Sequence, residues 1–197
     1  MIHVWKMHGC GNDFCIIPFD PYIMDYSKLA IKLCDRRLGI GADGLIIVKD
    51  NPLEAIFYNN DGTRFPMSGN GSRCFAKYCY DLGLAKKNML SVTTGVGKVE
   101  IEVLRNNPFT CKVNLGKPIF NNSMLGVDDE LNCFGRTIKI RDTYITIYSL
   151  FMDSIHTVIF VDDFDSNVLN YAKEMKVDRE LHNLLDVILN EDYSSSL

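Results

Sequence analysis

The clearest periodicity in the chain follows a glycine-rich loop at residues 69–71. Apolar side chains then recur three and four residues apart, which predicts a helix near residues 70–83 with one buried face: Phe75, Tyr78, Cys79 and Leu82. Gly83 follows the last of them and is expected to end the helix. Free N–H groups and the helix dipole favour an anion at a helix N-terminus. The loop is therefore predicted to receive a carboxylate or a phosphate.

Alternating and continuous apolar runs predict strands on both sides of this helix. The expected strands of the first half cover residues 2–7, 14–17, 45–48, 89–94, 98–104 and 109–115. A second group, at residues 136–140, 144–150 and 157–161, follows an irregular stretch at residues 116–135. That stretch is the predicted boundary between two lobes, which we place at residues 1–116 and 117–197.

Two further helices are predicted from the same kind of pattern. Ser27 is expected to cap a helix that ends near Gly39. Near the end of the chain, apolar residues at helical spacing predict an amphipathic helix: Leu181, Leu184, Leu185 and Ile188. Within residues 144–149, even-numbered side chains are expected on one face of a strand and odd-numbered side chains on the other.

The amino-acid composition is that of an ordinary globular protein. The chain has 197 residues, of which 47% are hydrophobic and 23% charged, as in ordinary globular proteins. The formal net charge of −4 argues against general binding to nucleic acids or anionic membranes. No apolar run reaches transmembrane length and no signal segment opens the chain, so a cytoplasmic location is expected. The seven cysteines are scattered, which predicts reduced core residues and no disulfide framework.

The remaining loops carry no specific signature by themselves. Residues 8–13 contain turn formers, so a plain hairpin connection is favoured over a binding loop built on the Asn12 amide. Residues 39–44 follow a helix and precede a strand, which is the reverse of the order that a dinucleotide-binding loop needs. The acidic residues 162–166 lack the glycine and the distal glutamate of a calcium loop, and helix capping is favoured there. No metal site is predicted.

Four segments taken together resemble the diaminopimelate epimerases, which are amino-acid isomerases that use no pyridoxal phosphate. The segments are residues 6–14, 39–45, 58–78 and, more weakly, 156–164. The resemblance implies an α+β fold of two similar lobes, each an antiparallel sheet curled around one central helix, with an amino-acid substrate between them. It implies no cofactor. The implied reaction inverts the α-carbon of LL-diaminopimelate to the meso form, a step of lysine and peptidoglycan precursor synthesis.

The resemblance also implies roles for individual residues. The positions that match the family's substrate contacts are Asn12, Asn59, Gly69 and Asn70, with Gly44 carried over weakly. Ser154 stands where the family has an asparagine that contacts substrate, and it is also carried over weakly. His156 matches a histidine that tunes the neighbouring acid–base group. No metal ligand is implied.

In the family each lobe donates one cysteine, and the two act as a thiolate and a thiol on opposite faces of the α-carbon. The first of these positions is Ser68 in this chain, and a serine hydroxyl is a far weaker acid than a thiol. The segment that would carry the second cysteine is absent from the sequence, so the second lobe is expected to be incomplete. Cys74 lies well into the helix, about 240° around it from Ser68, and is interpreted as structural.

The sequence therefore leaves three hypotheses for the function. The chain is an active epimerase of this family, a non-catalytic amino-acid-binding paralogue, or an isomerase of the same fold with another substrate. An incomplete second lobe would leave strand edges and an apolar helix face uncovered. On that basis we expect self-association, a homodimer included, or poor stability in solution.

Overall fold

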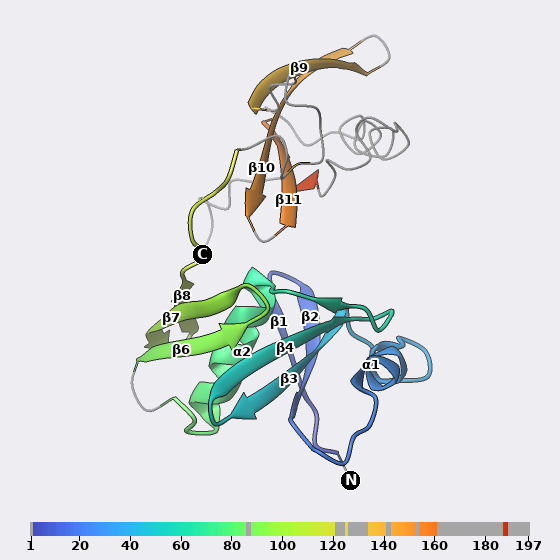
Figure 1. Cartoon of the computed structure of the whole chain (residues 1–197), viewed down its shortest axis with the longest axis vertical. Helices are drawn as coiled ribbons and strands as arrows, with labels where there is room; N and C mark the ends of the chain where they lie inside the picture. Colours follow the sequence, from blue (N-terminus) through green and yellow to red (C-terminus); the bar gives the residue numbers. More distant parts are fainter. Residues whose placement is uncertain are drawn as a thin grey trace. The chain divides into compact units, whose positions relative to one another are not determined.

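The computed structural model describes residues 2–85, 88–120, 125, 134–140, 143–152, 154–160 and 187–188. The chain groups into two compact units, Met1–Leu115 and Gly116–Leu197, and each is described by itself (Figure 1). The domain boundary given above from the sequence stays a prediction.

The first unit is built on one sheet of eight strands. The strands are β1 (Trp5–Gly9), β2 (Asn12–Pro18), β3 (Gly44–Asp50), β4 (Leu53–Asn59), β5 (Arg64–Phe65), β6 (Met89–Thr94), β7 (Gly97–Asn106) and β8 (Phe109–Val113). Their order across the sheet is β1-β2-β3-β4-β6-β7-β8, and β5 pairs with β4. All the strands expected from the sequence in this half are present, with small shifts at their ends.

Two strand pairs in this sheet are parallel, which differs from the expected antiparallel pattern. β2 pairs with β3 in parallel, and β4 pairs with β6 in parallel. In each case a helix stands between the two strands along the chain: α1 (Tyr26–Cys34) and α2 (Gly69–Asp81). A helix carries the chain back to the end of the sheet from which it came, so the next strand runs in the same direction. The remaining pairs are antiparallel.

Helix α2 lies inside the curve of the sheet (Figure 1). It contacts β1 and β8, which stand at opposite ends of the strand order, so the sheet wraps around it. The buried side chains include Phe75, Tyr78 and Cys79, as the helical period predicted. Leu82 was expected on the same face and is 44% exposed instead, because the helix ends at Asp81 and Leu82 is its C-cap.

Gly83 ends α2 as predicted. Its φ is +70°, in the left-handed region that favours glycine. The N–H of Gly83 donates to the carbonyl of Tyr80, and the N–H of Leu84 donates to the carbonyl of Cys79. These two bonds form a Schellman motif, which satisfies carbonyl groups that the helix leaves without partners.

Strands β2 and β3 are buried on both faces. Phe14, Ile16 and Ile46 belong to the core around α2. The neighbouring residues Cys15 and Leu45 belong to a second core that includes Ala30 and Cys34 of α1. This double burial explains why these strands are continuous apolar runs and not alternating ones.

Helix α1 starts earlier than the sequence suggested. Its N-cap is Asp25, whose carboxylate accepts a hydrogen bond from the N–H of Lys28 at 3.0 Å. Asp25 has the extended backbone that an N-cap requires, whereas Ser27 is already helical and its hydroxyl donates to the carbonyl of Gly62 at 2.8 Å. The helix ends at Cys34, five residues before Gly39.

The second unit contains a sheet in the order β12-β11-β10-β9. Its strands are β9 (Phe134–Ile140), β10 (Thr143–Met152), β11 (Ser154–Ile159) and β12 (Val187–Ile188). In β10 the alternation is confirmed, because Ile145, Ile147 and Ser149 are buried while Tyr144 is 70% exposed. Ile188 was expected at the end of a helix and pairs instead with β11, as suits a β-branched residue. The acidic residues 162–166 and the remaining leucines of the predicted helix lie outside the described residues.

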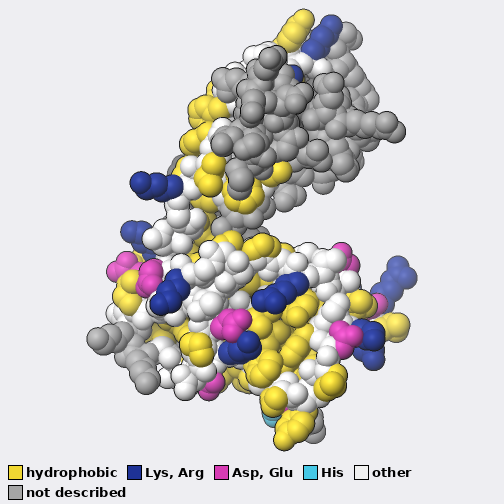
Figure 2. Space-filling model, viewed as in Figure 1, with side chains coloured by type: hydrophobic (Ala, Val, Ile, Leu, Met, Phe, Trp, Pro, Cys, Tyr) yellow, Lys and Arg dark blue, Asp and Glu magenta, His cyan; other side chains and the backbone are white. Residues whose placement is uncertain are grey.

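Basic and acidic side chains are interspersed over the face of the first unit that Figure 2 shows. Among the described residues, we find no helix with both the length and the apolar character needed to cross a membrane.

Candidate functional site

Ser68 caps the N-terminus of α2. Its hydroxyl oxygen accepts a hydrogen bond from the N–H of Gly71 at 3.0 Å, and its backbone is extended, with φ −135° and ψ 127°. The N–H groups of Gly69 and Asn70 have no acceptor within the part of the chain that the structure describes. The predicted anion cradle therefore has two backbone donors in place.

The structure brings Asn12 and Asn70 together across 58 positions of the sequence. The side-chain amide of Asn70 donates to the amide oxygen of Asn12 at 3.3 Å. Asn12 in turn donates from Nδ2 to the carboxylate of Asp43 at 2.9 Å. Because its oxygen and its nitrogen are both engaged, the Asn12 amide is held in one orientation. The loop between β1 and β2 is thus attached to the first turn of α2.

Asp43 joins several loops around this site, and the sequence reasoning missed it. One carboxylate oxygen accepts from Asn12 and from the N–H of Asp13 at 3.0 Å. The other accepts from Arg36 at 2.8 Å, and the Asp43 carbonyl accepts from the N–H of Asn60 at 3.1 Å. A signal that could have indicated Asp43 was present in the sequence. It is a carboxylate between two glycines, in the segment 39–45 that resembles the family.

Asp13 is the centre of an ion network behind that loop. Its carboxylate lies 2.7 Å from Arg36 and 3.2 Å from Lys6, and its side chain is only 14% exposed. The Arg36 guanidinium and, to a smaller extent, Lys6 hold the pKa of Asp13 well below its usual range, although burial opposes them. The network ties β1, β2 and the segment after α1 together.

We expect Asp13→Asn to lower the free energy of unfolding by about 1–3 kcal/mol at pH 7, because Lys6 loses its carboxylate partner and Arg36 retains only that of Asp43. The pKa of Asp13 is lower in the folded state, so the unfolded chain takes up the proton first as pH falls. The contribution is complete well above the unfolded value of about 3.9 and is lost progressively below about pH 5. Urea unfolding of both proteins from pH 7 to pH 3 should show the difference shrinking.

The exposed Asp50→Asn variant is the control, and its unfolding free energy should stay within about 0.5 kcal/mol of wild type. Parallel pH profiles for wild type and Asp13→Asn would contradict the assignment of this ion network.

Asn59 and Gly44 stand opposite each other in the β3–β4 ladder. The Asn59 side chain is exposed and donates to the hydroxyl of Thr63 at 2.9 Å, so it does not join the Asn12–Asn70 pair. Gly44 has a packing reason to be glycine, since a Cβ there would lie 2.7 Å from the carbonyl oxygen of Tyr58. The contact of either residue with substrate stays a prediction.

His156 and Ser154 belong to β11 of the second unit. The Nε2 atom of His156 lies 3.2 Å from the carbonyl oxygen of Met152, in the same strand hairpin. The side chain of Ser154 lies outside the described part of the structure. Because the two units are described separately, the role of these residues beside Ser68 stays a prediction.

Most of the described cysteines are core residues, as expected. Cys15, Cys34, Cys74 and Cys79 are buried, and none of the six described cysteines forms a disulfide; Cys133 lies outside the described residues. Burial raises the pKa of the Cys74 thiol to about 11, so this thiol stays protonated at neutral pH. A protonated, buried thiol fits the structural role assigned to Cys74.

Comparison with known proteins identifies the family. The sequence profile of the family described as diaminopimelate epimerase matches residues 4–121. The diaminopimelate epimerase of Caldanaerobacter subterraneus subsp. tengcongensis is 38% identical over 194 residues, which cover 95% of this chain and 69% of the relative. The enzyme of the same name from Clostridium perfringens is 37% identical and covers 80% of this chain and 61% of the relative. The chain thus spans about two thirds of the length of these relatives.

A solved structure supports the fold. A hydroxyproline epimerase from Agrobacterium vitis, crystallised with trans-4-hydroxy-L-proline, superimposes with a TM-score of 0.55. The match covers 80% of this chain and 50% of the other at 10% sequence identity, so it bears on the fold alone. The α+β fold with a sheet curled around a helix is shared. On the profile match and these relatives, the chain belongs to the diaminopimelate epimerase family.

Proposed function

We propose that this chain binds diaminopimelate through its α-carboxylate at the N-terminus of α2 and serves inversion of the α-carbon. The substrate is inferred from the names of the relatives, which are diaminopimelate epimerases. The observation that carries the proposal is the hydrogen bond between Asn12 and Asn70. It holds two amides beside the free N–H groups of Gly69 and Asn70, where a carboxylate would accept several hydrogen bonds.

The arrangement suits removal of a proton from an α-carbon. Such a step needs a base on one face, an acid on the other, and stabilisation of the negative charge that develops. Backbone N–H groups at the helix N-terminus supply part of that stabilisation without a cofactor. Ser68 stands next to them, at the position where relatives of this family are expected to carry the first thiol.

One observation favours a second candidate, an amino-acid-binding protein without catalysis. The hydroxyl of Ser68 is engaged as the N-cap of α2. None of the hydrogen bonds found for Ser68 among the described residues is to a histidine, a lysine or a carboxylate that could take its proton. A serine without such a base is a weak acid–base group. Binding of the amino acid would then persist while proton transfer fails.

Binding is therefore tested separately from chemistry. We expect LL- or meso-diaminopimelate to bind the 197-residue chain and Asn70→Ala to weaken that binding at least tenfold, since a buried polar contact worth about 1.5 kcal/mol is lost. Isothermal titration calorimetry measures the dissociation constants of the wild type and of Asn70→Ala. Asn106→Ala, at the exposed end of β7, is the matched control and should leave the dissociation constant unchanged.

The proposal fails if neither stereoisomer binds wild type, or if Asn70→Ala binds as tightly as wild type. Preference for another amino acid over diaminopimelate would instead support an isomerase of this fold with a different substrate.

A further inference from the structure

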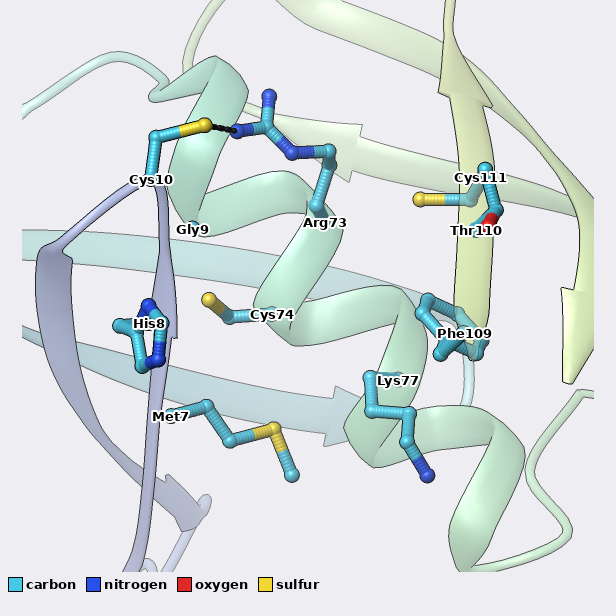
Figure 3. A pocket seen from close by; sticks show the side chains of 10 residues that line it. All are labelled: Met7, His8, Gly9, Cys10, Arg73, Cys74, Lys77, Phe109, Thr110 and Cys111. Carbon is cyan, nitrogen blue, oxygen red and sulfur yellow. Dashed lines mark hydrogen bonds between the residues drawn. The ribbon is translucent and has the colours of Figure 1, made fainter. Parts of the chain in front are cut away.

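The first unit contains a cavity of about 510 Å³ that the proposed function does not use. It lies between β1 with the turn that follows it, the middle of α2, and the start of β8 (Figure 3). Side chains from these three elements surround it. Arg73 and Lys77 enter from α2, Met7 from β1, and Phe109 and Cys111 from β8.

The charge of this cavity has one sign. Its lining includes Arg73 and Lys77 and no aspartate or glutamate. Lys77 forms an ion pair with Asp81 and lies 5.5 Å from the centre of the Phe109 ring. Arg73 differs, because the ion pairs found within the described residues do not include it. The cavity therefore presents a guanidinium whose charge is not balanced by a carboxylate of the residues that the structure describes.

The contacts of Arg73 are with neutral groups. Its Nη2 donates to the amide oxygen of Asn70 and lies 3.5 Å from the sulfur of Cys10 (Figure 3). The side chain is partly buried. Burying part of a charge without an opposite charge is costly, and a guanidinium offers a fork of donors that matches a carboxylate. An anion in the cavity would supply the missing charge.

Apart from His8, the other walls of the cavity are apolar or weakly polar. Cys74 is 3% exposed, and Met7, Phe109 and Cys111 are partly buried around the core of the unit. Thioether, thiol and aromatic groups pack well against a flat apolar ligand. We propose that this cavity binds a small organic carboxylate with an aromatic or aliphatic body, whose carboxylate pairs with Arg73 and whose body fills the space between Met7 and Phe109.

This site goes beyond the proposed function and communicates with it. Arg73 is hydrogen bonded to Asn70, and Asn70 is hydrogen bonded to Asn12. A carboxylate that binds Arg73 would contact the same guanidinium that donates from Nη2 to the Asn70 amide oxygen. Occupation of the cavity should consequently alter the environment of the Asn70 side chain, which the proposed function places against the substrate.

The first experiment compares two probes of nearly equal shape on the full 197-residue chain by titration calorimetry. We expect 2-naphthoate to bind at least about tenfold more tightly than the neutral 2-naphthalenemethanol, because only the carboxylate forms a charge-assisted pair with Arg73. Arg73→Met retains the aliphatic stem and should weaken 2-naphthoate about tenfold. Arg37→Met, at an exposed position outside the cavity, is the matched control and should not change the affinity.

The second measurement does not depend on a variant. In ¹H–¹⁵N spectra of wild type, 2-naphthoate should shift the side-chain NH₂ signals of Asn70 more than those of Asn59, which lies outside the Arg73–Asn70–Asn12 chain of contacts. Equal affinity of the acid and the alcohol, no binding of either, or full retention of 2-naphthoate binding in Arg73→Met would each overturn the proposal. Because the Gly69 and Asn70 N–H groups of the proposed cradle remain in Arg73→Met, loss of 2-naphthoate binding in that variant assigns the carboxylate to the cavity and not to the cradle.

Discussion

Ser68→Cys is expected to raise the rate at which the α-hydrogen of bound diaminopimelate exchanges with solvent deuterium by about 10²–10⁴-fold, the range of general acid–base catalysis. A thiol has an ordinary pKa near 8.5, whereas a serine hydroxyl hardly ionises without a base beside it. Position 68 is also the N-cap of α2, where the helix dipole favours a thiolate. A base of suitable strength would then stand beside the anion cradle.

Deuterium incorporation, followed by mass spectrometry, suits this prediction because exchange needs a base on one face only. It does not require inversion of the α-carbon. Wild type already carries Cys74 in the same helix, so any exchange due to a buried thiol appears in its background rate. Ser68→Gly is the control that has neither a thiol nor a hydroxyl at position 68, and it retains most of the capping stability of a serine.

The result separates the two proposed functions. Exchange in Ser68→Cys supports a site built for proton transfer. If calorimetry shows bound diaminopimelate and Ser68→Cys still exchanges no faster than Ser68→Gly, the chain is an amino-acid-binding protein and the catalytic proposal fails.

Phe75→Ala is expected to lower the free energy of unfolding of the first unit by about 3–5 kcal/mol, the usual cost of removing a buried phenyl ring. Phe75 is fully buried on α2, inside the curve of the sheet. It belongs to the same core cluster as Phe57, Ile16 and Ile46, which lie on three different strands. A cavity at this position removes contacts between the helix and much of the sheet, and close packing lets it collapse only in part.

Tryptophan fluorescence during urea unfolding measures this effect in the first unit. The chain has one tryptophan, and Trp5 packs edge-on against Tyr78 of α2 with ring centres 5.0 Å apart. Leu82→Ala, at the exposed end of the same helix, is the control and should cost about 0.5 kcal/mol or less. Similar decreases in the free energy of unfolding for Phe75→Ala and Leu82→Ala would mean that α2 is not the centre of the core.

The helix and strands of the first unit could be predicted because their signals are local. The spacing of Phe75, Tyr78 and Cys79 records which face of α2 is buried, and Gly83 marks its end. Helix starts were less certain, since Asp25 and Ser27 are both good caps and only the backbone conformation decides between them. The parallel pairs depend on where each helix returns the chain, which periodicity does not record.

The candidate site was only partly predictable for a related reason. The resemblance named Asn12 and Asn70, and the structure brings them into contact. The ion network through Asp13, Arg36 and Asp43 joins residues 7 to 30 positions apart, so no spacing rule indicated it. The position of Arg73, with no carboxylate partner among the described residues, is a property of three-dimensional packing that the sequence does not record.

The hydrogen bonds that join Asn12, Asn70 and Asp43 have a consequence for the entropy of ligand capture. These amide and carboxylate groups are already ordered by one another in the free protein. Immobilising a flexible side chain on binding costs about 0.5–1.5 kcal/mol, and here that loss of freedom occurs when the chain folds. An amino acid that replaces or shares these bonds would meet a rigid receptor, so affinity at this site would depend on the integrity of the surrounding loops as much as on direct contact.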